Sequence, residues 1–475
     1  MNDMPRSPTL YAPARPGKHV GSTVAPQHVG STVAPQPSET KRFARLGLTS
    51  AHLPPPMLPD PPPRRPLRTA PFGVLDVGST KVTCLIGRMD QDGQLRVLGF
   101  GMRQARGVRA GGITDLDAAE HAVRGAVGAA ETMADHRLRS VTVNLTCGKP
   151  ESRLFSVKWP VGGRAVTEAD VRRVVQEGRS RAAVDGRESV HTLPLGFAVD
   201  GTPGVGDPRG LHCDTLSARL HVVDAASTAL RNLETAVLRC ELYISELVSA
   251  PMAAGLSALV EDERQLGVTL IDMGGGTTGI AVFSEGNMLH TAQLPVGGSH
   301  VTNDLARLLS ISVADAERLK TVYGNAESSP DDEREILSVP LVGEEDQDYA
   351  KIPRSQLVDA IRPRLEETFE LVRAQLDGAG LAREAGTRVV LTGGASQLVG
   401  VREMAGRVLD RQTRLGRPLP LRGLPDDVAG PGAATAAGLL NWAGGVGRTL
   451  ADVDLSNDRP ARFLSRVVNF VRNRL

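Results

Sequence analysis

The sequence has few aromatic residues and no strong excess of charge of either sign. Phe, Trp and Tyr together make up 3% of the 475 residues, which argues against an aromatic surface on which single-stranded nucleic acid could stack. The formal net charge is +1, so the chain has no global positive field that would favour a polyanion. We therefore expect no nucleic-acid partner.

Cysteines and long apolar runs are also scarce. The four cysteines are scattered and form no Cys-x-x-Cys pair, which indicates free thiols in a reducing cytosol rather than a disulfide framework or a metal site. No apolar run approaches the roughly 18 residues needed to span a bilayer. The N-terminus lacks the apolar segment of a signal peptide. The sequence thus predicts neither a transmembrane helix nor an export signal.

The most informative segment that is present runs from Val268 to Phe283 and reads VTLIDMGGGTTGIAVF. Two apolar runs enclose Asp272 and a turn of small residues, which predicts strand, tight turn and strand. Glycines allow successive backbone N–H groups to converge on a phosphate, and threonines add hydroxyl donors. The alternative is a Gly-rich hairpin without a ligand. The candidate phosphate ligands are Gly274, Gly275, Gly276, Thr277 and Thr278.

A second segment, FGVLDVGSTKVTCLIG from Phe72 to Gly87, has the same order of parts. Each segment is followed by another β-like run, so the chain contains two related halves, and two such loops facing each other would clamp a nucleotide. The two acids at the strand ends, Asp76 and Asp272, are candidates to hold a divalent cation through water. The upstream loop offers Gly78, Ser79, Thr80 and Lys81, of which Lys81 either reaches a phosphate or is a solvated strand residue.

These two loops, together with the downstream run LTGGAS at 391–396, resemble the actin-like ATPase superfamily. Within it, an inserted segment and a C-terminal tail resemble FtsA, a family of bacterial cell-division proteins, and the resemblance covers residues 72 to 475. It implies an α/β protein with the actin-like ATPase fold. Two lobes would surround a nucleotide cleft, and an FtsA-type 1C (SHS2-like) domain would be inserted in the first lobe.

The resemblance also implies the ligands. ATP with Mg²⁺ would lie between the lobes, with Asp76 and Asp272 on the waters of the metal and the two loops on the phosphates. Glu317 and Lys320 share one face of a predicted helix and would bind the ribose and adenine, the alternative being a surface ion pair. Glycine-containing turns would let the backbone approach the ligand at Gly297, Gly298, Gly393, Gly394 and Ala395.

The length predicts several domains, since 475 residues exceed one compact core. A Pro-rich extension with the repeat HVGSTVAPQ is expected to be disordered, either without defined function or as a basic arm for a partner or membrane. One helix is expected within Ile244–Leu259, broken near Pro251, and another over most of Lys351–Leu376, interrupted near Pro363. The predicted order is 1–70 extension, 71–145 lobe 1 (1A), 146–224 domain 1C, 225–442 lobe 2 (2A/2B, with 305–375 as 2B) plus the closing helix of lobe 1, 443–460 linker and 461–475 terminal helix.

The terminal segment ARFLSRVVNFVRNRL predicts a basic amphipathic helix. Such a helix behind a flexible linker suits the surface of an anionic membrane and is too short to span it. The alternative is a helix docked on its own protein or on a partner, while the resemblance implies FtsA's membrane-targeting helix. The membrane-facing candidates are apolar (Phe463, Leu464, Val467, Val468, Phe470, Val471) and basic (Arg462, Arg466, Arg472).

The resemblance implies a protein that polymerises at the cytoplasmic face of the inner membrane at the division site. It would bind the C-terminal tail of FtsZ on 2B, tether FtsZ filaments and recruit other divisome proteins through 1C. Gly279 stands where many superfamily members carry an acid, so we expect weak ATPase activity at most and assign no catalytic residue. The alternatives are a soluble actin-like adaptor of pilus assembly and a small-molecule kinase of the same fold.

Overall fold

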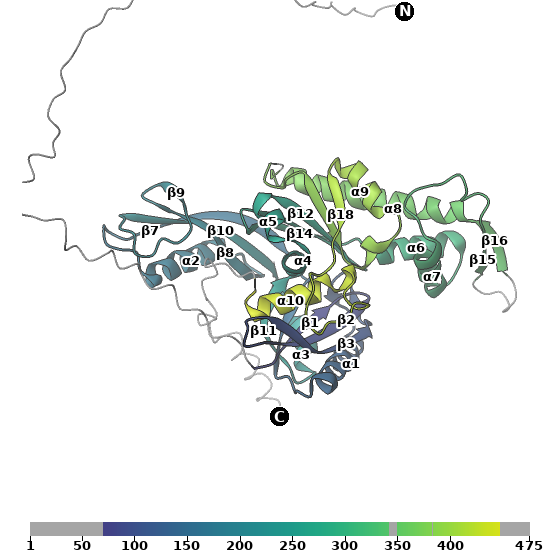
Figure 1. The fold of residues 1–475 in the computed structure, drawn as a ribbon, viewed down its shortest axis with the longest axis horizontal. Helices are drawn as coiled ribbons and strands as arrows, with labels where there is room; N and C mark the ends of the chain where they lie inside the picture. Colours follow the sequence, from purple (N-terminus) through teal and green to yellow (C-terminus); the bar gives the residue numbers. More distant parts are fainter. Residues whose placement is uncertain (1–69, 342–348, 382, 447–475) are drawn as a thin grey trace, which may run out of the picture. The chain divides into compact units, whose positions relative to one another are not determined.

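The computed structural model describes residues 70–341, 349–381 and 383–446, and all of them belong to one unit, Arg65–Leu475. The predictions for the N-terminal extension and for the amphipathic helix at 461–475 lie outside the described residues. The strand-turn-strand predictions lie within them, and the structure confirms both (Figure 1).

The first half contains a five-stranded sheet in the order β11-β6-β1-β2-β3. β1 pairs antiparallel with β2 and parallel with β6, so both of its edges are paired, and its residues 73–77 are buried. Helix α1 packs on β2 and β3 and is capped by the Asp115 carboxylate. The strands are β1 (Phe72–Val77), β2 (Lys81–Met89), β3 (Leu95–Gln104), β6 (Ser140–Leu145) and β11 (Tyr243–Ser249), and the helices are α1 (Leu116–Ala134) and α3 (Ser227–Leu238). The short strands β4 (Val108–Arg109) and β5 (Gly112–Ile113) pair with each other.

The second half repeats this plan in the order β18-β17-β12-β13-β14. Again a central strand, β12, pairs antiparallel with the strand after the loop and parallel with a strand far along the chain. The strands are β12 (Val268–Met273), β13 (Thr278–Ser284), β14 (Asn287–Leu294), β17 (Arg388–Thr392) and β18 (Gln412–Leu415). The other elements are α5 (Glu261–Leu266), α6 (Gly298–Leu309), α7 (Val313–Tyr323), β15 (Ile336–Pro340), β16 (Tyr349–Pro353), α8 (Arg354–Gly378) and α9 (Val401–Leu409).

Two small-residue helices, α4 (Ala250–Ala258) and α10 (Ala434–Gly444), pack against each other in a core that also receives side chains from both sheets. Almost every residue of these helices is buried, and small side chains let the backbones approach. The contact is closest at Gly438, where a Cβ atom would overlap the carbonyl oxygen of Ala253. This pair therefore fixes the distance between the two halves.

The inserted segment forms its own four-stranded sheet, in the order β7-β10-β8-β9, with one helix packed on it. The Thr167 hydroxyl and the Asp170 carboxylate make a reciprocal capping box at the start of that helix. Arg164 donates to the same carboxylate at 2.6 and 2.7 Å. The elements are β7 (Glu151–Pro160), α2 (Glu168–Ala182), β8 (Arg187–Val199), β9 (Thr202–Val205) and β10 (Thr215–Ala226).

Buried polar contacts fasten the inserted domain to both halves. The backbone N–H of Ser249, on β11, donates to His191 Nε2 at 2.9 Å. The backbone N–H of Thr291, on β14, donates to Ser152 Oγ at 3.2 Å, and the same hydroxyl contacts His221 Nε2. Burial lowers the pKa of His221 to about 3, so this ring is neutral at physiological pH.

Two predicted helices differ from the structure. The helix predicted within Ile244–Leu259 is α4, but it is not broken near Pro251: residues Tyr243–Ser249 form a strand that pairs in parallel with β6, and Pro251 lies in the first turn of α4, where its missing N–H is not needed. The predicted interruption at Pro363 is also wrong, since α8 continues through it. The buried face of α8, which includes Leu357 and Ile361, holds it against the core of the second half.

We expect Gly438→Ala to destabilise the protein by about 1 to 3 kcal/mol, because overpacking at the α4–α10 contact forces the helix backbones apart. Thermal unfolding measures the effect. The control is Gly128→Ala in α1, where nothing lies within 4 Å of an added Cβ; it should stabilise the helix by about 0.5 to 1 kcal/mol. Equal effects of the two changes would contradict the role assigned to Gly438.

Candidate functional site

Residues from both halves line one cleft, whose space, open solvent included, amounts to about 640 Å³. It brings together most of the predicted ligands: Asp76, Gly78, Ser79, Thr80, Lys81, Asp272, Gly274, Gly275, Gly276, Thr277, Gly393 and Gly394. It also contains residues that the sequence did not single out: Gly111, Asn144, Thr146, Ala250, Gln293, Gly432 and Thr435. Two loops that are far apart in the sequence thus face one space, as their repetition predicts.

The two glycine-containing loops have the same turn and touch each other. In each, the first glycine N–H donates to a carbonyl three residues on: Gly78 to Lys81 at 3.0 Å and Gly274 to Thr277 at 2.9 Å. A Cβ at Gly276 would lie 2.5 Å from Ser79 Oγ, so this approach tolerates no side chain. The loops form a cradle of backbone N–H groups and hydroxyls suited to an anion.

The two acids lie at the carboxyl ends of equivalent strands, where Asp76 is buried and Asp272 is half-buried. Asp76 is 8% exposed, and burial raises the pKa of Asp76 from 3.8 to about 7; Lys81 opposes this increase and Asp272 adds to it. Burial likewise raises the pKa of Asp272 to about 6, against the hydrogen bond that the Thr435 hydroxyl donates at 2.9 Å and the charge of Lys81. The ligand-free site therefore holds two carboxylates whose charges are poorly compensated.

This donor set fits a hard divalent cation with phosphate. Two carboxylates, hydroxyls and a glycine cradle supply the oxygen and N–H groups that magnesium and phosphate require. Within the described residues, no group of three or more His, Cys, Asp or Glu could enclose a metal ion. A cation here would consequently take most of its ligands from water and phosphate.

A second predicted group lies beside the loop of the second half rather than in the cleft lining. Lys320 Nζ donates to Gly298 O at 3.2 Å, to Thr302 Oγ1 at 2.8 Å and to Glu317 Oε2 at 2.7 Å. Its side chain is only 14% exposed, so the predicted pair is not a simple surface ion pair. The remaining members of the group are Gly297 and Ala395, which pack against Gly274 and Gly298 respectively.

One predicted ligand has a structural contact instead. Thr278 is fully buried, and its hydroxyl donates to the carbonyl of Val296 at 2.8 Å. Among the residues that sequence reasoning missed, Asn144 pairs through its amide with the backbone of Val77, next to Asp76. A polar residue in the apolar run SVTVNL was the available signal for it. No comparable signal marks Thr435 and Gly432 in the sequence, because they belong to a run of small residues that indicates helix packing.

Comparison with known proteins decides the family. The family described as "Cell division protein FtsA" matches residues 269–438, and the SHS2 domain inserted in FtsA matches residues 148–224. The chain is 43% identical over 394 residues to the cell division protein FtsA of Agrobacterium fabrum, an alignment that covers 81% of this chain and 89% of that protein. The chain belongs to the FtsA family.

Other comparisons agree with this. The FtsA of Escherichia coli K12 is 35% identical over 376 residues, covering 78% of this chain and 89% of that protein. A solved structure of the PilM–PilN type IV pilus biogenesis complex aligns with a TM-score of 0.57 at 17% identity, covering 78% of this chain and 98% of that one, which bears on the fold alone. The predicted resemblance to FtsA and the actin-like ATPase fold with its SHS2 insertion are confirmed.

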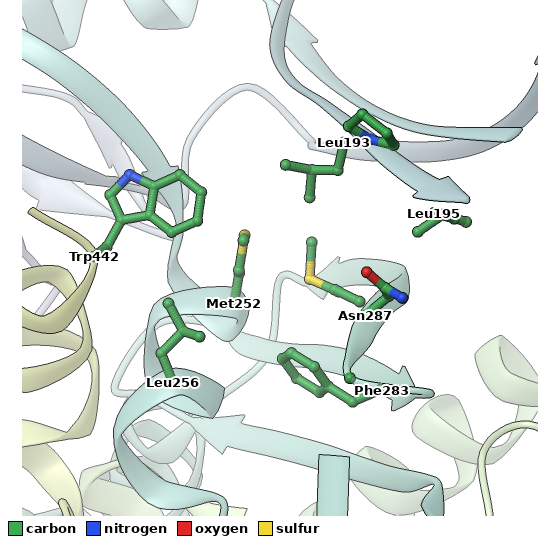
Figure 2. A pocket seen from close by; sticks show the side chains of 10 residues that line it. Leu193, Leu195, Met252, Leu256, Phe283, Asn287 and Trp442 are labelled. Atoms are coloured by element: carbon green, nitrogen blue, oxygen red, sulfur yellow. The ribbon is translucent and has the colours of Figure 1, made fainter. Parts of the chain in front are cut away.

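This member of the FtsA family has a second hollow, which is apolar (Figure 2). Leu193 and Leu195 of β8 approach it from the inserted domain, Met252 and Leu256 line it from α4, and Trp442 of α10 faces them. No ionisable side chain lines this hollow, so it offers nothing to a phosphate. Among the described residues no helix is both long and apolar enough to cross a bilayer.

Asp76→Asn should raise the stability of the ligand-free protein at alkaline pH. The pKa of Asp76 is about 7 in the folded chain and 3.8 in its ordinary state, so folding takes up a proton between these values. The stability of the native protein is therefore lost as the pH rises through about 7, and the amide removes that loss. We expect a gain on the order of 1 to 3 kcal/mol at pH 8 that shrinks towards pH 5.

Thermal unfolding between pH 5 and pH 8 measures this difference. The control is Asp185→Asn, which removes an exposed acid of the inserted domain. A stability difference between Asp76→Asn and the native protein that is the same at both pH values would show that Asp76 is ionised throughout.

Proposed function

We propose that this chain binds ATP with Mg²⁺ in the cleft and uses the nucleotide-bound form to tether FtsZ filaments to the cytoplasmic face of the inner membrane. The observation that carries the nucleotide part is the convergence of two carboxylates, from Asp76 and Asp272, on two touching glycine loops. The FtsA family membership carries the division part. Each part has a test of its own below.

In the cleft, different residues of this chain would bind different parts of the ligand. Backbone N–H groups of the two loops and the Lys81 ammonium would hold the phosphates. Asp76 and Asp272 would hold the waters of the magnesium ion, which neutralises phosphate charge when bound. Glu317 and Lys320, fixed at the start of α6 through Gly298, would contact the nucleoside. Binding would relieve the uncompensated charge of Asp76 and Asp272.

The subdomain around α7, β15 and β16 is proposed to bind the C-terminal tail of FtsZ. Three large apolar side chains are exposed there: Val322 at 62%, Ile336 at 54% and Tyr349 at 57%. Exposed apolar groups of this kind suit an apolar peptide. The inserted domain is proposed to contact neighbouring subunits in a filament and other divisome proteins, in keeping with its position outside the nucleotide lobes.

Membrane attachment is proposed for residues 461–475, on the basis of their sequence pattern. A single short amphipathic helix binds weakly, but a filament that carries many copies gains affinity because each anchor raises the local concentration of the next. Self-association and membrane binding would thereby support each other. No observation specifically supports the pilus-adaptor or the kinase alternative, since the likeness to PilM concerns the fold alone.

Lys81→Gln should weaken ATP binding about tenfold or more, because the change removes a positive charge from the cleft. Lys81 partly offsets the charges of Asp76 and Asp272, so thermal unfolding must first show that the variant is folded at the temperature of the titration. Isothermal titration with ATP and Mg²⁺ measures the affinity. Lys158→Gln on the exposed surface of β7 is the control and should bind as the native chain does. Equal affinity of both variants for ATP would show that Lys81 does not contact the bound nucleotide.

A chain that ends at Ala461 should lose membrane binding and keep nucleotide binding. Co-sedimentation with vesicles of anionic lipid in the presence of ATP measures the first, with zwitterionic vesicles as the control. We expect the full chain to pellet with the anionic vesicles only, and the shortened chain to remain in the supernatant. If the full chain also stays in the supernatant, the terminal helix is a docking helix and the tethering proposal fails.

A further inference from the structure

Three residues form a row across the sheet that borders the cleft. In the register of β12, β13 and β14, Asp272 lies opposite Gly279, and Gly279 lies opposite Gln293. Residues that face each other across antiparallel strands project from the same face of a sheet. Gln293 is therefore on the face that carries Asp272, two strands away, or roughly 10 Å at the usual strand spacing. Both residues line the cleft.

The middle position of this row has no room for a side chain. A Cβ at Gly279 would overlap the ring of Pro251 and would lie 3.2 Å from Gln293 Oε1. The space that an acid at position 279 would need is thus taken by a residue of α4 and by the neighbouring glutamine. Gln293 supplies the polar group at this end of the cleft that Gly279 lacks.

The Gln293 amide is also free to act on a ligand. Three other uncharged polar groups of the cleft are engaged: the Asn144 amide pairs with Val77, the Thr435 hydroxyl with Asp272 and the Thr146 hydroxyl with Gly111. Within the described residues, Gln293 makes no hydrogen bond through its side chain, which is partly exposed to the cleft. An amide offers one acceptor oxygen and two N–H donors on a single rigid plane.

We propose that Gln293 is the positioning residue for ATP hydrolysis in this chain, an inference that rests on the proposed binding of ATP. Its Oε1 accepts a hydrogen bond from the attacking water, and its Nε2 donates to an oxygen of the terminal phosphoryl group. The water oxygen forms a bond to the γ-phosphorus, the bond from that phosphorus to the β–γ bridging oxygen breaks, and ADP leaves with that oxygen. The proton of the water passes to phosphate or solvent.

This assignment accounts for weak turnover. A glutamine amide has no basic site that could take the proton from water, so it orients the nucleophile without activating it. A well-placed hydrogen-bond donor that acts in the transition state still raises the rate of the reaction, typically by about 10²-fold. Gln293 therefore contributes to the transition state and little to the binding of ATP itself.

The test compares ground-state and transition-state ligands. Gln293→Ala and Gln293→Leu, the second of which keeps the bulk of the side chain, are titrated with ATP, with ADP, and with ADP plus aluminium fluoride and Mg²⁺. We expect both variants to bind ATP and ADP within about threefold of the native chain. Their affinity for the aluminium fluoride complex should fall tenfold or more, with a parallel loss of single-turnover hydrolysis. Gln265→Ala, in an exposed helix, is the control and should change nothing.

The other outcomes overturn the inference. Equal affinity of native and variant chains for the fluoride complex would show that Gln293 does not face the transferred group. An equal loss for ADP and for the complex would make it an ordinary binding residue, and a native chain that gains no affinity from fluoride has no such site. Failure of the native chain to bind ATP at all would instead refute the proposed function.

Discussion

The structure depends on two carboxylates, one buried and one half-buried, whose charges act on each other. Asp76 and Asp272 end the central strands of two separate sheets, and both pKa values are raised because water is removed from around them. Burying charge is costly unless a partner compensates it, and among the described residues Lys81 and Thr435 do so in part. A fold that keeps such a pair is most stable when an external cation completes the site. The proposed nucleotide and metal would thus act as structural elements of the domain as well as ligands.

The surrounding architecture brings the ends of the two central strands, and with them Asp76 and Asp272, close together. Both sheets place a central strand between one antiparallel and one parallel neighbour, so that each loop leaves its strand at the same edge. Helices α4 and α10 bring these edges together because their facing residues are too small to separate the backbones. Glycines then let the two loops touch. The repetition of the halves, which is visible in the sequence, becomes a site only through the two helices that connect them.

Much of this could be predicted from the sequence, and the exceptions have physical reasons. The loops, their acids and the capped helices are local patterns, in which the chemistry of adjacent residues decides the conformation. Tyr243–Ser249 was mistaken for helix because a short apolar run does not reveal its partner, β6, which lies about 100 residues away. Pro363 was given too much weight because the buried face of α8 outweighs one lost hydrogen bond. Gln293 gave no signal, since its role depends on register across β13.

The hydrogen bond between Thr291 and Ser152 has a consequence beyond packing. Thr291 and Gln293 are two positions apart on β14, so the same strand carries a residue of the cleft and a contact with the inserted domain. Thermodynamic linkage is reciprocal: if the nucleotide changes the affinity of a protein bound to the inserted domain, that protein changes the affinity of the nucleotide by the same factor. A protein that binds the inserted domain could therefore respond to nucleotide in the cleft and change the affinity of the cleft for nucleotide.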